Sequence, residues 1–248
     1  MRANKFLAWT LASTLVAGLA AAADNVLVSD AEREQTLRGQ LQHLHIANLK
    51  VNVLGKMATL EGTAESLFQV RQASTIAKRS PEIEEVFNDL EVIGVEDETL
   101  ERALGAQLGS DIHYTIYDEV QLSVARGRVV LTGRLAPEGD PGAIEETLSK
   151  VPGVGAIENR IRVLPFYSGD DKLREAVAIV VYDALGQKRL AHSRLHIVVE
   201  NGRVTLSGTV PDEETRTVAE EAARQVEGTD SIENRLTLDE RPGARASP

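Results

Sequence analysis

Apolar and polar residues alternate in three separated parts of the chain, a pattern typical of strands with one buried face. The alternation is clearest in the third part, at Leu195, Ile197, Val199, Val204, Leu206 and Val210. Asn201-Gly202 separates the two runs, and this dipeptide favours a tight hairpin. We therefore predict a pair of antiparallel strands here, with matching turns at Gly55-Lys56 and Arg126-Gly127.

The three parts are copies of one unit, because the same residue types recur at fixed distances. Each copy has a glycine two residues after a leucine and an asparagine 26 residues after that glycine. These residues are Gly62, Gly133 and Gly208, with Asn88, Asn159 and Asn234. A glycine inside a strand marks a bulge or the close approach of another backbone, which we expect to be the following helix. We interpret the asparagine as a turn or strand-edge hydrogen bonder, so both residue types are assigned structural roles.

Helical periodicity precedes each hairpin and recurs between its second strand and a third strand. The best first helix runs from an Asp170-Asp171 N-cap to a stop at Gly186, and a second helix covers Thr215–Val226. The apolar stripe of the first helix is Leu37, Leu41 and Leu44 in copy one, Leu100, Ala103, Leu104 and Leu108 in copy two, and Leu173, Ala176, Val177, Val180, Val181 and Ala184 in copy three. Because two amphipathic helices can cover a small sheet, we predict an α+β fold. It consists of three tandem αββαβ modules, each a small three-stranded sheet covered on one face by two helices.

The beginning of the chain has the features of a secretory signal peptide. Arg2 and Lys5 precede an apolar stretch at 6–20, and Ala21-Ala22-Ala23 offers a cleavage site. An uncleaved membrane anchor is the alternative. We expect a signal peptide at 1–23, modules at 24–95, 96–166 and 167–239, and a disordered tail at 240–248. The exported chain would have no integral membrane span after cleavage and would be soluble in the periplasm.

The repeat resembles the BON domain, a family named for bacterial osmotically inducible periplasmic proteins and nodulation proteins. The resemblance lies in the αββαβ order, in the hairpin from Val199 to Val210, and in Val151-Pro152-Gly153-Val154 leading to Ile157-Glu158-Asn159. It is strongest in copy three and weakest in copy one, where Ser80-Pro81-Glu82 replaces the Pro-Gly segment. The resemblance implies a non-enzymatic envelope module that engages phospholipid or protein partners, with a chaperone-like role in some relatives.

Composition narrows the range of partners. The hydrophobic share of 42% and the charged share of 26% are typical of a folded domain. The formal net charge of −11 opposes binding to nucleic acid or anionic membranes unless a local basic patch overrides it. Cysteine is absent, which excludes disulfides, thiolate metal sites and an acylated lipoprotein cysteine. Aromatic residues make up 4%, too few to suggest a stacking platform for sugars or single strands, so we expect no nucleic-acid partner.

No constellation in the sequence predicts catalysis, a metal or a cofactor. The five histidines stand at different distances from the repeat glycine, so no ligand position recurs in His43, His45, His113, His192 and His196. Neither a dinucleotide-binding motif nor a phosphate loop surrounds the glycines, and no serine lies in a Gly-x-Ser-x-Gly elbow. We therefore expect a protein that is not an enzyme and that uses no cofactor.

The polar face of the second sheet is the candidate site. If the apolar positions point inward, the alternate positions present Arg128, Arg134, Arg160 and Arg162 together on the outward face. Guanidinium groups clustered in this way can bind anionic groups. They could hold phospholipid head groups or an acidic partner. Alternatively, they could dock against the acidic sheet of copy one, which presents Glu61, Asp89 and Glu91 with Lys50 as the exception, or simply be solvated.

These observations predict a periplasmic, non-enzymatic binding protein of the cell envelope that is stress-related or chaperone-like. Repetition of a weakly binding module would raise its affinity through avidity. Two alternatives are a peripheral phospholipid-binding protein and a structural adaptor of a secretion or cell-wall assembly. The expected partners are envelope proteins or anionic phospholipid head groups. Osmotic stress enters only as an implication of the family resemblance.

Overall fold

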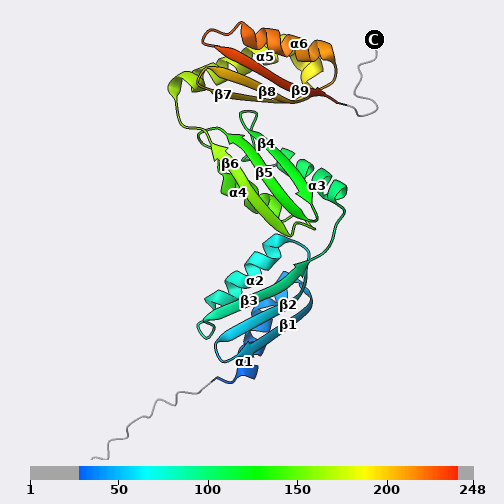
Figure 1. The fold of residues 1–248 in the computed structure, drawn as a ribbon, viewed down its shortest axis with the longest axis vertical. Coiled ribbons are helices and arrows are strands. Elements are labelled where there is room, and N and C mark those ends of the chain that lie inside the picture. The colour runs from blue at the N-terminus through cyan, green and yellow to red at the C-terminus, as the bar shows by residue number, and fades with distance from the viewer. Residues whose placement is uncertain (1–27, 240–248) are drawn as a thin grey trace, which may run out of the picture.

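The fold is seen in a computed structural model that describes residues 28–239. The expected signal peptide at 1–23 and tail at 240–248 therefore lie outside the described residues. Three small sheets follow one another along the long axis of the molecule, each with helices on one face (Figure 1). The α+β architecture of three tandem modules predicted from the sequence is confirmed.

Each module contains helix, strand, strand, helix and strand in that order. The first comprises α1 (Asp30–Leu41), the 3-10 turn η1 (Gln42–Leu44), β1 (Ala47–Leu54), β2 (Met57–Ala64), α2 (Leu67–Arg79) and β3 (Glu85–Val92). The second comprises α3 (Asp97–Gly109), β4 (Glu119–Ala125), β5 (Arg128–Leu135), α4 (Pro141–Ser149) and β6 (Ala156–Val163). The third comprises α5 (Ser168–Leu190), β7 (Arg194–Glu200), β8 (Arg203–Val210), α6 (Glu213–Arg224) and β9 (Ser231–Leu238).

The strand pairing is the same in all three sheets. The first two strands form the predicted antiparallel hairpin, and the third strand pairs parallel to the second. A parallel neighbour requires a crossover connection, which the second helix of each module supplies. The register repeats as well, since the leucine before the repeat glycine always lies opposite the repeat asparagine, in the pairs Leu60–Asn88, Leu131–Asn159 and Leu206–Asn234.

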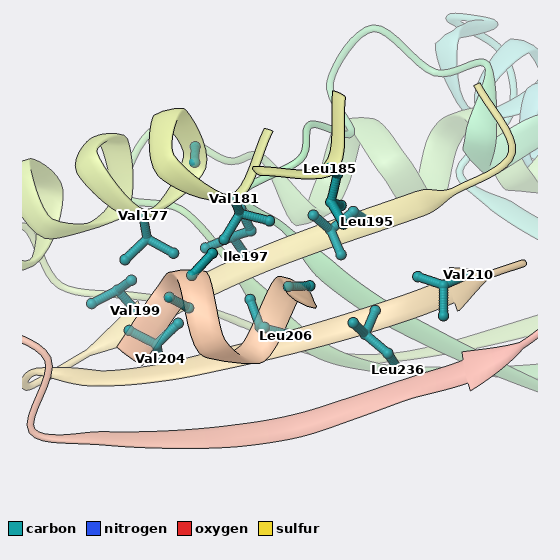
Figure 2. Close-up of a cluster of buried hydrophobic side chains, with 14 of the residues drawn as sticks. Val177, Val181, Leu185, Leu195, Ile197, Val199, Val204, Leu206, Val210 and Leu236 are labelled. Carbon is teal, nitrogen blue, oxygen red and sulfur yellow. The ribbon is translucent and has the colours of Figure 1, made fainter. Parts of the chain in front are cut away.

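Each module has its own hydrophobic core between the sheet and its helices. Figure 2 shows the core of the third module, where Val177 and Val181 of α5 face Ile197 of β7 and Leu206 of β8. The predicted inward positions of the strands are buried or half-buried, apart from the last residues of β6 and β9, which are exposed. The helix stripes are narrower than predicted, because Ala103, Val180 and Ala184 are exposed.

Asp170, the predicted N-cap of the first helix of the third module, has another role in the structure. Helix α5 begins at Ser168 with Tyr167 as its N-cap, and it continues past a kink at Gly186. The Asp170 carboxylate instead accepts hydrogen bonds from the backbone amides of the hairpin turn in its own module. Equivalent aspartates do the same in the other modules: Asp30 with Gly55, Asp97 with Arg126 and Gly127, and Asp170 with Asn201 and Gly202. The sequence signal for this bond between helix and hairpin turn was an aspartate near the start of the first helix in every module.

The repeat glycines approach a strand and not the following helix. A Cβ added to Gly133 would collide with the carbonyl oxygen of Glu119, and one added to Gly208 would collide with that of Arg194. Both carbonyls belong to the first residue of the antiparallel partner strand. The expected close approach is therefore present, but the neighbour is the first strand of the hairpin.

The repeat asparagines lie inside each module and connect the third strand to the second helix. The Nδ2 group of Asn159 donates to the carbonyl of Pro141 at 2.9 Å and to Glu145 Oε2 at 3.1 Å, while its Oδ1 atom accepts from Ile161 N. Asn88 and Asn234 make the equivalent bonds in the first and third modules, with the hydroxyl of Ser74 in place of the carboxylate in the first. The interpretation as a turn or strand-edge hydrogen bonder therefore missed the partner helix.

Candidate functional site

The four predicted arginines lie on the face of the second sheet that points away from its helices. Arg128 and Arg134 lie on β5, whose intervening residues Val129 and Leu131 are buried, and Arg160 and Arg162 lie on β6. Arg128 and Arg160 are exposed. Arg134 and Arg162 occupy directly opposite positions on β5 and β6, at the end of the sheet next to the third module (Figure 1).

Arg134 and Arg162 converge on one carboxylate of the third module. Arg162 donates two hydrogen bonds to Glu200, at 2.8 and 2.7 Å, and Arg134 lies 3.8 Å from the same carboxylate. This two-pronged contact is the strong form of the arginine–carboxylate pair. It also holds the pKa of Glu200 below its ordinary value, chiefly through the hydrogen bond from Arg162.

A second carboxylate extends this ionic network across the two modules. Glu119, at the start of β4, is bonded to Arg134 at 2.5 Å within its own sheet. It also pairs at 3.2 Å with Arg235 of β9 in the third module. Arg160 pairs within its own strand with Glu158. The ion pairs of the candidate arginines thus involve the second and third modules, whereas the expected acidic residues of copy one are not among their partners in the described part of the chain.

The same two modules also meet at a strand edge. The backbone amide of Ile197 on β7 donates to the carbonyl of Ile116, at 2.7 Å, in the loop before β4. Next to it, His196 Nδ1 lies 3.2 Å from the Thr115 carbonyl, and the His196 ring lies 4.8 Å from that of Tyr114. Burial lowers the pKa of His196 and raises that of Tyr114 to about 12. No pattern in the sequence indicated this contact, because only the fold brings together His196 and Thr115, which are 81 residues apart in the chain.

A groove of about 780 Å³ runs along this junction. Its lining combines helix α3, strand β4 and the sheet of the third module, with Arg102, Arg194 and Arg235 among the residues. The groove is open to solvent and mixes polar with apolar groups. It lacks the enclosed, dry character typical of a small-molecule site.

The first two modules are joined through loops and helices. The Gly153 amide donates to the carbonyl of Glu65, and the Leu67 amide donates to that of Val154, both at 2.8 Å. Arg71 of α2 and Glu145 of α4 add an ion pair of 2.6 Å. The outward face of the first sheet takes no part in these bonds.

That outward face of the first sheet carries apolar and acidic side chains. Leu54 is 72% exposed and Phe87 is 47% exposed, and Met57 is exposed between them on the hairpin. The acidic side chains are Glu61, Glu85, Asp89 and Glu91, of which Glu61 lies 3.5 Å from Lys50. We call this surface, formed by Leu54, Met57 and Phe87 with its acidic neighbours, the first-module face.

The described part of the chain holds neither a metal-ligand cluster nor a membrane-spanning helix. Within residues 28–239, no cluster of three or more histidine, aspartate or glutamate side chains is placed to hold a metal ion. Over the same span, none of the helices combines the length and the apolar character needed to cross a membrane.

The fold therefore defines a protein of three tandem αββαβ modules, of which the first two meet through loops and helices and the last two through charged residues of their sheets. The family model of the BON domain matches residues 29–94, 96–165 and 171–240. The chain belongs to the BON domain family, as the resemblance of its repeats implied.

Comparison with individual proteins adds little to the family assignment. No curated protein matches the chain. Among solved structures, it is similar to the C-terminal domain of CdsD, a structural protein of the type III secretion system of Chlamydia trachomatis, at 16% identity and a TM-score of 0.25, covering 85% of this chain and 99% of that one. A second CdsD structure, at the same identity and TM-score, covers 86% of this chain and 94% of the other. At these TM-scores the likeness does not bear on function.

Proposed function

We propose that this protein is a non-enzymatic binding protein of the bacterial cell envelope, located in the periplasm, that holds protein partners in a stress-related, chaperone-like role. The first-module face carries this proposal. Exposed apolar side chains on a flat sheet surface, with charged groups around them, are typical of surfaces that contact other proteins. Membership of the BON domain family supports an envelope-related role.

A light-scattering assay tests the proposal directly. The chain of residues 24–248 is expected to slow the aggregation of a chemically unfolded test protein. Phe87→Ser combined with Leu54→Ser should abolish the effect, because it removes the two most exposed apolar side chains of the first-module face. Ile179→Ser is the control, since Ile179 is about as exposed as Leu54 but lies on α5. A wild-type chain that does not slow aggregation contradicts the proposal.

A second candidate function is peripheral binding to anionic phospholipid. The exposure of Arg128 and Arg160 on the outward face of the second sheet favours it. These side chains are accessible to phosphate groups even while Arg134 and Arg162 contact Glu200. Short-range pairing with phosphate would have to outweigh the negative net charge, so binding would weaken as salt rises.

Liposome flotation distinguishes this candidate from the first. We expect recovery with phosphatidylglycerol vesicles at low salt, a loss at high salt, and none with zwitterionic vesicles. Arg128→Glu with Arg160→Glu should reduce recovery severalfold. Lys78→Glu with Arg79→Glu makes the same charge change on α2 and should reduce it much less. Equal losses in the two double variants would remove the arginine face from consideration.

A further inference from the structure

Arg134 and Arg162 have the geometry of an anion site. Their register places them side by side on neighbouring strands, and both guanidinium groups reach the same carboxylate of Glu200. Two converging arginines present several N–H donors in fixed planes, an arrangement that fits the oxygen atoms of phosphate as well as those of carboxylate.

The group that occupies this position comes from another module of the same chain. Glu200 is the last residue of β7 and precedes the Asn201-Gly202 turn of the third module. Its contact with Arg162 is therefore an intermodule contact as well as an ion pair. A carboxylate supplied in cis occupies the place that a ligand oxyanion would take.

The Arg162–Glu200 ion pair is accessible from solvent, whereas the neighbouring Arg134–Glu119 pair is largely buried. The side chain of Arg162 is 52% exposed and that of Glu200 is 28% exposed, whereas Glu119 on the other side of Arg134 is only 6% exposed. An ion pair that is open to water on one side is screened by solvent and salt, even where two parallel hydrogen bonds strengthen it, as they do here. An outside anion can thus compete with Glu200 by way of Arg162, while Arg134, only 14% exposed, keeps its pair with the buried carboxylate of Glu119.

We infer that Arg134 and Arg162 form a binding site for a phosphate or carboxylate group, which Glu200 of the third module occupies in the absence of ligand. The inference rests on the second candidate function and adds the regulation of that site. Ligand binding and the docking of Glu200 exclude each other. By thermodynamic linkage, each weakens the other by the same factor.

Release of Glu200 does not require the modules to separate. The Ile197–Ile116 backbone bond and the Arg235–Glu119 pair lie elsewhere in the same junction and hold it together. The released state would then free Arg162 beside Arg128 and Arg160 on one continuous sheet face, while Arg134 keeps its pair with Glu119. Anionic ligands that bridge several of them, such as a phospholipid surface, would gain most from the release.

Glu200→Gln tests the inference, because it removes the competing charge and keeps the shape of the side chain. Binding of inorganic phosphate, followed by NMR titration of the arginine side chains, should tighten about fivefold or more. Flotation with phosphatidylglycerol vesicles should increase in the same variant. Glu214→Gln is the control, since it removes an equal charge from an ion pair with Arg189 inside the third module and should change neither measurement.

The outcomes separate the inference from the function on which it rests. If the wild type floats with anionic vesicles and Glu200→Gln behaves like Glu214→Gln, the inference is overturned and the candidate function stands. If no variant binds either phosphate or vesicles, both are overturned. The inference is supported if Glu200→Gln binds phosphate or vesicles more tightly than the wild type and if adding Arg162→Ala removes this increase. A gain with phosphate identifies a site for single oxyanions, and a gain with vesicles alone identifies a site for a lipid surface.

Discussion

At the scale of single residues, the repeat glycine fixes how closely the two hairpin strands approach. Gly133 adopts a φ of +132°, in the range that favours glycine, and faces the carbonyl of Glu119. Any side chain there would be strained and would also push β4 away from β5. The leucine–x–glycine spacing visible in the sequence is therefore a signature of this contact.

We expect Gly133→Ala to destabilise the second module by about 3 kcal/mol, from backbone strain together with the steric overlap. Gly105→Ala is the control, because Gly105 lies in α3 with no neighbouring atom near the added Cβ. That change should be neutral or stabilising by about 0.5–1 kcal/mol. Hydrogen exchange of β5 amides measures both, and equal protection in the two variants would contradict the assignment.

The repeat asparagine contributes a different kind of stabilisation. Asn234 donates to the Arg216 carbonyl and to Glu220 of α6, while it accepts from Leu236 N on its own strand. Its removal takes one partner from each of these partly buried groups, although Glu220 keeps its bond with Arg224. We expect Asn234→Ala to cost about 1–3 kcal/mol in the third module.

Urea unfolding of Asn234→Ala, compared with that of Asn52→Ala, checks this expectation. Asn52 is exposed on β1, so its replacement should change the midpoint very little. Glu220 offers a second measurement. Its pKa is held below the ordinary value mainly by the hydrogen bond from Asn234, and the substitution should therefore raise it.

At the scale of elements, the edge of β7 makes the contact between the second and third modules sensitive to pH. Burial keeps the pKa of His196 below 6.5, so the docked state prefers the neutral ring, although Asp118 and Glu119 nearby partly offset this. Undocking returns His196 to water and to its ordinary pKa. The docked state binds fewer protons, and its stability is therefore full above pH 6.5 and declines as pH falls below that value.

We expect protection of the Ile197 amide against hydrogen exchange, corrected for the intrinsic rate, to decrease between about pH 7 and pH 5. His196→Gln should remove this dependence, because glutamine does not titrate in the range. Glu200 adds a second decline below pH 4.5, where its carboxylate becomes protonated and releases Arg162. Identical pH profiles in wild type and His196→Gln would show that another group controls the junction.

At the scale of the whole molecule, the segment that carried the family resemblance also joins the first two modules. Gly153 donates its amide to Glu65, and a Cβ at this position would overlap Val95 in the connecting segment. The resemblance alone did not indicate this contact. The arrangement of the first two modules thus depends on a glycine that has no room for a side chain.

Gly153→Ala should loosen that junction and leave the cores of the modules intact. Because the chain contains no cysteine, spin labels can be attached at Lys78→Cys and Gln107→Cys without a background signal. We expect a broader distribution of distances between the labels in Gly153→Ala than in the wild type. Gly39→Ala, which meets no neighbouring atom on α1, should leave the distribution unchanged.

The local order of elements followed from the sequence alone. Alternation of apolar residues, hairpin turns and helical periodicity are consequences of backbone geometry over a few residues, and they repeat three times here. For that reason the αββαβ order, the antiparallel hairpin and the buried face of each strand could be predicted. The outward placement of the four arginines depends on the same alternation.

The partners of those outward residues were decided by the tertiary structure. The pairing of Arg162 with Glu200 depends on how one folded module rests on the next, and the charge pattern within a single module does not specify this. The contact of His196 with Tyr114 was likewise decided by the tertiary structure. So was the packing of the repeat glycine, such as Gly133, against a strand and not a helix. Contacts between distant residues follow from the packing of whole elements, whose orientation is set by many small interactions together. The sequence alone therefore determined the modules and their faces, and the tertiary structure decided which face meets which residue.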